Sequence, residues 1–180
     1  MSTWSQLLAE APTPDEAARS SVIDRSGHVL RPKGALDRLD QIAAFLAGWQ
    51  RTAVPVIERP RLLIAVADHG VANRGVSAYP PEVTAAMLQA FEKGVATSTV
   101  LANRLGVTVE VIDAGVGSPT GDLSIEDALD DDRFELCISL GRRAVVDSDC
   151  DLLLLGEMGI GNTTAAAAVV ATLFGGEIQE

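Results

Sequence analysis

Three short apolar segments, each followed by a loop of glycine and polar residues, constrain the fold of this chain more than any other feature. They are Arg61–Ala67, Val107–Ile112 and Asp151–Leu155. Arg61–Ala67 has the length and apolar character of a strand buried on both faces. Val107–Ile112 alternates and is rich in β-branched residues, which also predicts a strand, and Asp151–Leu155 is the third. Helical patterns separate them, and this alternation predicts an α/β fold: a parallel sheet with right-handed crossovers and helices on both faces.

The helical pattern is clearest in residues 36–49, where apolar side chains recur at helical spacing and charges occupy the other face. Residues 81–105 begin with Pro and Glu, and Gly94 is expected to bend or split this helix. Further helices are expected at residues 13–23, at residues 134–146, and from Asn162 or Thr163 to Gly175 and Gly176.

The length and composition suit one folded core. With 180 residues, 47% of them hydrophobic and 22% charged, the chain can bury the interior of a single domain. We assign residues 1–60 to an N-terminal helical segment and residues 61–180 to the α/β core. The net charge of −11 argues against nucleic acid as a partner, because such a surface needs clustered Lys and Arg.

Several other classes of protein are not expected. No apolar run reaches the roughly 18 residues of a membrane span, and no signal peptide pattern is present, so we expect a cytoplasmic protein with no membrane partner. Cys137 stands between Leu136 and Ile138, and Cys150 shortly precedes the apolar residues 152–155, and both are expected to be buried free thiols. With two histidines and no cysteine pair at ligand spacing, no metal is expected.

The loop after the third apolar segment, GEMGIGNTT, has the composition of an anion site. Gly159 and Gly161 allow the backbone to approach a ligand closely. Asn162 and Thr163 stand at a helix start, where free N–H groups and the helix dipole favour an anion such as a phosphate. The same residue types also cap helices that bind nothing, so both interpretations stay open. Glu157 stands among these groups although a carboxylate beside a phosphate is unfavourable.

Two other stretches carry candidate side chains. Asp68 and His69 follow the first strand, which suggests acid–base or metal chemistry, or simply a turn with a packed histidine. Because the carboxyl ends of parallel strands meet at one edge, we expect them to share a cleft with the third loop. Tyr79, the only tyrosine, precedes a helix that begins with proline, a position suited to stacking on a flat ring.

Three motifs carry a family resemblance when they are taken together. They are RPKGALDRL from Arg31, ADHGVANRGVSAYPPEVT from Ala67 and GEMGIGNTTAAAA from Gly156. In this order they resemble the nicotinate-nucleotide–dimethylbenzimidazole phosphoribosyltransferases, and the resemblance covers residues 29–174. It implies an open, Rossmann-like parallel sheet with part of a small helical domain at the N-terminus, a homodimer, and no cofactor or metal.

The resemblance also implies a reaction of cobalamin biosynthesis. A nitrogen of 5,6-dimethylbenzimidazole attacks the anomeric carbon of nicotinate mononucleotide, nicotinate leaves, and α-ribazole 5′-phosphate forms. Glu157 is then the catalytic carboxylate near the ribose. The implied phosphate cradle is Gly159, Gly161, Asn162 and Thr163, and the implied benzimidazole pocket contains Ser77, Tyr79 and Pro80, with Asp68 and His69 in the same cleft.

Two features depart from the family pattern. Family members are nearly twice this length, and their usual catalytic base lies in a Gly-Glu-Gly segment that this sequence lacks. The stretch after Asp113 is acidic where the family carries a basic, glycine-rich segment. We therefore expect activity to depend on a C-terminal partner half, and we expect an apolar sheet edge and the face of residues 165–173 to be exposed.

These departures leave alternatives open. The chain is a phosphoribosyltransferase, half of a split enzyme, or a truncated and non-catalytic nucleotide-binding module of the same family. An unrelated nucleotide-binding oxidoreductase is disfavoured because the sequence has no dinucleotide fingerprint.

Overall fold

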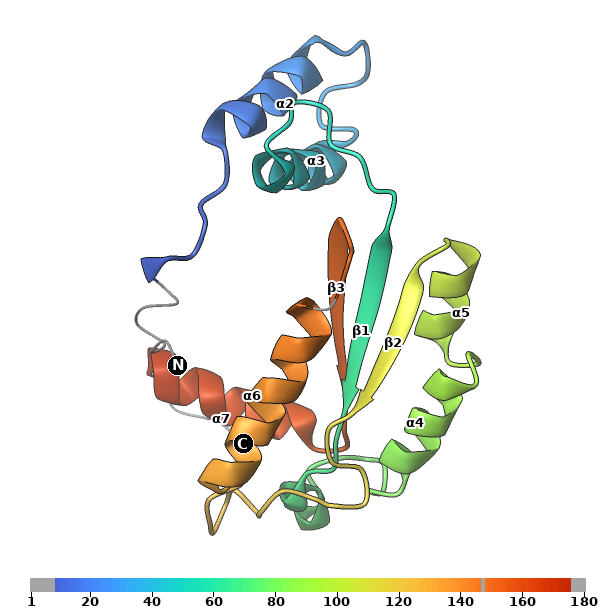
Figure 1. Cartoon of the computed structure of the whole chain (residues 1–180), viewed down its shortest axis with the longest axis vertical. Helices are drawn as coiled ribbons and strands as arrows, with labels where there is room; N and C mark the ends of the chain where they lie inside the picture. Colours follow the sequence, from blue (N-terminus) through green and yellow to red (C-terminus); the bar gives the residue numbers. More distant parts are fainter. Residues whose placement is uncertain (1–8, 147, 176–180) are drawn as a thin grey trace. The chain divides into compact units, whose positions relative to one another are not determined.

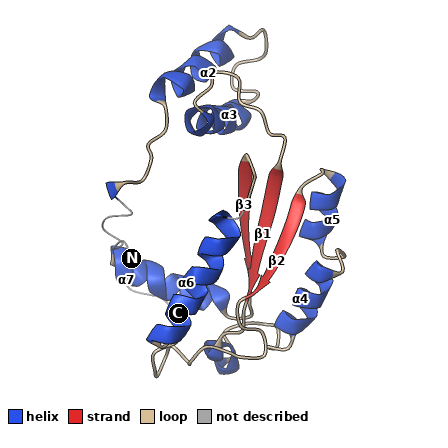
Figure 2. Ribbon diagram, in the orientation of Figure 1, coloured by secondary structure: helices blue, strands red, loops and turns tan. Residues whose placement is uncertain are grey.

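The computed structural model describes residues 9–146 and 148–175. The chain divides into two compact units, Met1–Glu58 and Arg59–Glu180. In the described ranges, the main elements of the first unit are the helices α2 and α3, and the second unit contains the strands β1, β2 and β3 with further helices, as the colours of Figure 2 show. Within the described ranges, no helix combines the length and apolar character that a membrane crossing requires.

The first unit is built from α2 (Glu16–His28) and α3 (Asp37–Gln50). The carboxylate of Asp15 accepts hydrogen bonds from the backbone N–H groups of Ala17 and Ala18 at 2.9 and 3.0 Å. This cap fixes the start of α2 three residues later than we expected from the sequence. The core of the unit consists of small and apolar side chains, namely Ala18, Val22, Ala44 and Ala47.

The second unit has the strand order β2-β1-β3, with all three strands parallel, which confirms the α/β fold (Figure 1). The strands are β1 (Pro60–Val66), β2 (Thr108–Asp113) and β3 (Leu152–Met158). The helical elements are η1 (Gly70–Arg74), α4 (Val83–Glu92), α5 (Thr97–Arg104), α6 (Asp131–Val146) and α7 (Asn162–Phe174).

The strand order reverses at β1, which has β2 on one side and β3 on the other. Such a reversal leaves the carboxyl ends of two neighbouring strands beside a crevice, and open α/β sheets bind their ligands there. The strand register pairs Ala65 with Glu157 and Val66 with Met158. Because successive side chains of a strand point to opposite faces, Glu157 and Met158 lie on opposite faces of the sheet.

In the second unit, the element boundaries follow the sequence prediction to within about two residues, with three exceptions. Gly94, at φ 68°, does split the long helix into α4 and α5, as expected. α6 starts three residues early because Asp130 accepts the backbone N–H of Arg133 at 2.8 Å. β3 was expected to end at Leu155, but its pairing with β1 continues to Met158, so Glu157 lies within the strand. The short helix η1 was not predicted.

The C-terminal helices of this unit are loosely covered. Among the described residues, only Ala144 is buried on α6 and none on α7. Cys137 and Cys150 are free but only half-buried, so the expectation of buried thiols was wrong. Leu155 on the edge strand β3 is 75% exposed and Leu173 is 71% exposed, which confirms the expected exposure of this edge and helix face.

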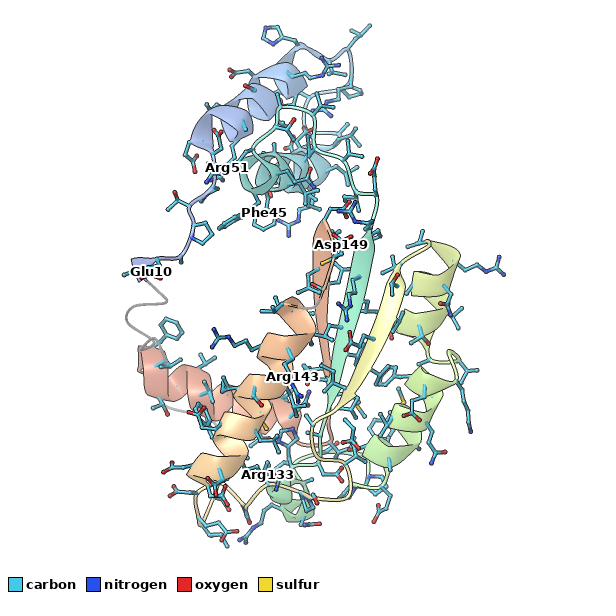
Figure 3. The ribbon with its side chains drawn as sticks, in the orientation of Figure 1. Glu10, Phe45, Arg51, Arg133, Arg143 and Asp149 are labelled. Carbon is cyan, nitrogen blue, oxygen red and sulfur yellow. The ribbon has the colours of Figure 1, made fainter. Side chains whose placement is uncertain are left out.

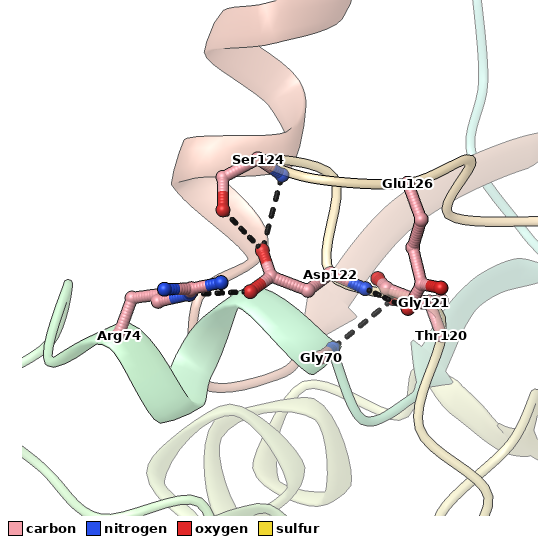
Figure 4. Close-up of polar contacts among 7 residues, drawn as sticks. All are labelled: Gly70, Arg74, Thr120, Gly121, Asp122, Ser124 and Glu126. Carbon is pink, nitrogen blue, oxygen red and sulfur yellow. Dashed lines mark hydrogen bonds and ion pairs between the residues drawn. The ribbon is translucent and has the colours of Figure 1, made fainter.

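An ion pair ties the segment after β1 to the segment after β2 (Figure 4). Arg74 in η1 donates from Nε to the carboxylate of Asp122. That carboxylate also accepts hydrogen bonds from the hydroxyl and the backbone N–H of Ser124, at 2.7 and 3.0 Å. The Ser124 hydroxyl, and after it Arg74, lower the pKa of Asp122 to about 2.

This ion pair predicts a specific acid sensitivity. A carboxylate with a lowered pKa contributes stability above its ordinary pKa of 3.8, and this contribution disappears as the pH falls towards about 2. We expect Asp122→Asn to lose less stability than the wild type between about pH 4 and pH 2, as measured by urea denaturation with circular dichroism. Asp132→Asn, at an exposed site on α6, is the control. Identical pH dependence in Asp122→Asn and the wild type would contradict the role given to the ion pair.

Candidate active site

The candidate site lies where β1 and β3 end side by side. A Cβ atom on Gly159 would lie 2.3 Å from the carbonyl oxygen of Ala67 and 2.8 Å from Cδ2 of His69. No other residue type fits at this position without a shift of the backbone. The missing side chain therefore lets the His69 ring rest against the chain that leaves β3.

A tight turn connects this contact to α7. Gly161 adopts φ 88°, and the backbone N–H of Asn162 donates to the carbonyl of Gly159 at 3.1 Å. The side chain of Asn162 then links the strand to the helix. Its Nδ2 donates to Glu157, and its Oδ1 accepts the backbone N–H of Thr163 at 2.8 Å. Glu157 is thus bonded to the residue that begins α7.

Thr84, in the first turn of α4, holds the same turn in place. It is not among the site residues predicted from the sequence. Thr84 is fully buried, and its hydroxyl accepts the backbone N–H of Ile160 at 3.0 Å. Since the N–H of Ile160 is buried as well, losing this bond would leave a polar group without a partner. Only its place at the end of the AYPPEVT motif marked Thr84, because a threonine in a first helical turn is otherwise common.

Two pockets flank the turn. The tyrosine pocket has a volume of about 450 Å³ and is lined by Val76, Ser77, Tyr79, Val83, Met87, Met158, Gly159, Ile160, Gly161, Asn162 and Thr163. The glutamate pocket has a volume of about 400 Å³ and is lined by Ala65, Ala67, His69, Glu157, Met158, Asn162, Thr163, Ala165, Ala166 and Val169. Glu157 lines only the glutamate pocket and Tyr79 only the tyrosine pocket, whereas Met158, at the end of β3, lines both.

The structure therefore distributes the predicted site residues over two adjoining pockets. His69 and Glu157 line the glutamate pocket. Ser77, Tyr79, Gly159 and Gly161 line the tyrosine pocket, while Asn162 and Thr163 line both.

Two of the predicted site residues line neither pocket. The carboxylate of Asp68 instead accepts the backbone N–H of Gly117, after β2, at 2.7 Å. Pro80 is exposed, and its carbonyl accepts the backbone N–H of Val83 at 3.1 Å. Asp68 therefore connects the end of β1 to the loop after β2.

The electrostatics of the two pockets come from backbone groups and from few side chains. None of the described residues that line them is Lys or Arg. Burial lowers the pKa of the His69 imidazole below its ordinary value of 6.5, while the charges of Glu157 and Asp68 oppose this shift. His69 is therefore neutral at pH 7. Among the residues that the structure describes, no group of three His, Cys, Asp or Glu side chains could hold a metal ion.

The close approach at Gly159 predicts a strong effect of a single methyl group. Gly159→Ala should lower the free energy of unfolding by about 1–3 kcal/mol, since the new Cβ overlaps backbone that cannot move freely. Urea denaturation measures this loss. Gly141→Ala, on α6 with nothing within 4 Å of its Cβ position, is the matched control and should be neutral or stabilising. Equal effects of the two substitutions would contradict the tight contact.

The surroundings of His69 predict its titration. NMR of the ring protons, with the His69 signal assigned by its loss in His69→Gln, should give a pKa below 6.5. Glu157→Gln removes a charge that raises this pKa, so it should lower the value further. A higher pKa for His69 in Glu157→Gln would place the carboxylate elsewhere.

Comparisons with known proteins identify relatives of this chain. The family model described as phosphoribosyltransferase matches residues 11–180. The nicotinate-nucleotide–dimethylbenzimidazole phosphoribosyltransferase of Jannaschia sp. (strain CCS1) is 44% identical over 173 residues, which are 96% of this chain and 51% of that protein. The protein of the same name from Ruegeria pomeroyi is 42% identical over 176 residues, 98% of this chain and 52% of the relative.

A solved structure shows the same fold. The crystal structure of nicotinate-nucleotide-dimethylbenzimidazole phosphoribosyltransferase from Thermus thermophilus matches with a TM-score of 0.76 and 34% identity, covering 89% of this chain and 54% of that chain. The present chain thus spans about half the length of the curated relatives that it matches. Because the family model covers nearly all of the sequence, the chain belongs to this phosphoribosyltransferase family.

Proposed function

We propose that this chain supplies part of an active site that transfers phosphoribose from nicotinate mononucleotide to 5,6-dimethylbenzimidazole, a step of cobalamin biosynthesis. The relatives carry the name of this activity. The observation that carries the proposal is the position of Glu157, a carboxylate in one pocket with the first turn of α7. That arrangement offers a site for positive charge beside a site for a phosphate.

In the proposed reaction, a nitrogen of dimethylbenzimidazole forms a bond to the anomeric carbon of the ribose. The bond from this carbon to nicotinate breaks, and nicotinate leaves with the electron pair. The benzimidazole ring loses its N–H proton to a base. As nicotinate departs, the anomeric carbon gains positive character, and the charge of Glu157 stabilises it.

The phosphate is proposed to bind at the start of α7, where backbone N–H groups and the helix dipole favour an anion. Gly159 and Gly161 keep this turn free of side chains, and the hydroxyl of Thr163 adds a donor. The N–H of Thr163 is bonded to Asn162 Oδ1 in this structure. We therefore expect it to exchange this partner for a phosphate oxygen when the nucleotide binds.

Dimethylbenzimidazole is proposed to bind in the tyrosine pocket, with Ser77 and Pro80 near its entrance. The apolar walls of Val83 and Met87 suit a methylated ring, and Tyr79, which is 66% exposed, is placed to stack on it. The ribose then spans the region of Asn162 and Thr163, which line both pockets together with Met158. Neutral His69 is available as a hydrogen-bond partner beside Glu157.

Completion of the site by further protein is part of the proposal. The two pockets lack a cationic side chain among their described lining residues, while a phosphate carries about two negative charges. The edge of β3 and the face of α7 expose apolar side chains, which suits burial against another protein surface. We propose that this surface is covered by a C-terminal partner half that carries the rest of the family's length, or by a second copy of this chain in a cytoplasmic homodimer.

The charge of Glu157 can be tested directly. Glu157→Gln should lower kcat by about 100-fold, because it removes stabilisation of a charge that develops only in the transition state. The Kd for nicotinate mononucleotide should change less than about threefold. Steady-state kinetics and calorimetry measure the two effects, with Glu92→Gln, at an exposed site on α4, as the control. A loss confined to affinity would reverse the role given to Glu157.

The activity itself is tested by mass spectrometry of the reaction mixture. The chain is incubated with both substrates, alone and together with the C-terminal half of the Jannaschia relative. Formation of α-ribazole 5′-phosphate in either mixture supports the proposal. Binding of nicotinate mononucleotide without product in either would instead identify a non-catalytic nucleotide-binding module, and absence of both would refute the assignment.

A further inference from the structure

Arg133 reaches from α6 to the β2 loop, which we define as residues 114–120. Arg133 lies in the first turn of α6, and its guanidinium extends away from the helix (Figure 3). One nitrogen, Nη1, donates to the carbonyl of Pro119 at 2.8 Å, and the other, Nη2, donates to the carbonyl of Ser118. A Cβ on Gly115 would lie 2.6 Å from Nη2, so this glycine leaves the space that the guanidinium fills.

The β2 loop in turn holds both neighbours of His69. The N–H of Gly117 donates to the Asp68 carboxylate at 2.7 Å, and the N–H of Thr120 donates to the Asp68 carbonyl at 3.2 Å. On the other side of His69, the N–H of Gly70 donates to the Thr120 hydroxyl at 3.1 Å (Figure 4). The backbone on each side of the histidine is therefore bonded to one short loop.

The direction of these loop bonds depends on the peptide units that Arg133 fixes. A guanidinium presents its donors in a rigid plane, so it can hold two consecutive carbonyls in one orientation. A lysine ammonium at the same place would act as a point charge without this geometry. When the carbonyls of Ser118 and Pro119 are fixed, the N–H and hydroxyl of Thr120 are directed towards Asp68 and Gly70.

We propose that Arg133 is a positioning residue for the candidate active site. Through the β2 loop it holds the turn of Asp68, His69 and Gly70, and so keeps the His69 ring against Gly159 and beside Glu157. The link to catalysis rests on the proposed function, whereas the positioning of His69 does not.

The test uses the titration of His69 by NMR in the full chain. Arg133→Met keeps an unbranched side chain about as long as the arginine stem and removes the guanidinium donors. It should raise the pKa of His69 towards 6.5, because a looser turn exposes the ring to water while Asp68 and Glu157 remain near it. Arg133→Lys should restore part of the wild-type value. Arg142→Met, at an exposed site on the same helix, should leave the titration unchanged.

Three outcomes decide the proposal. A raised pKa with unchanged helix content supports it, and the product assay then shows separately whether the reaction depends on it. An unchanged pKa in folded Arg133→Met overturns it and leaves Arg133 as a brace for α6 alone. If Arg133→Met does not fold, Thr120→Val decides, because it cuts the connection at Gly70. A wild-type His69 titration in folded Thr120→Val also overturns the proposal.

Discussion

The close approach of the end of β3 to the end of β1 at Gly159 is the constraint on which the site depends. Since no side chain intervenes, the backbone after Met158 can turn at once into α7, and the His69 ring can rest against that turn. The position of Glu157 follows, because its strand must run to within one residue of the contact. A bulkier residue would separate the strands where the pockets form.

The same turn reconciles a carboxylate with a helix start that favours anions. The amide nitrogen of Asn162 donates a hydrogen bond to Glu157, and its amide oxygen accepts one from the N–H of Thr163. The carboxylate is thus held to one side of the turn, and its charge faces the glutamate pocket. An amide is well suited to this position because it offers a donor and an acceptor in one rigid group.

The sequence predicted the sheet and the meeting of Glu157 with His69, because the carboxyl ends of parallel strands must share an edge. It did not predict that Glu157 and Tyr79 face different pockets. That division depends on whether Glu157 belongs to the strand. The sequence of residues 156–158 predicts a loop, because glycine is unfavourable in strands. The roles of Thr84 and Arg133 could not be predicted from the sequence for another reason. Their roles come from contacts with Ile160 and with Ser118, far away in the sequence.

The exposed edge of β3 has a consequence for the chain in solution. An edge strand with apolar side chains can pair with a strand of another chain. Leu154 and Leu155 are exposed on the edge strand β3, and neither carries a charge that would discourage such pairing. The proposed assembly with another protein surface and aggregation would therefore compete for this one edge. The concentration of the proposed partner surface, relative to the concentration of the chain, would then determine what fraction of the chain stays in solution.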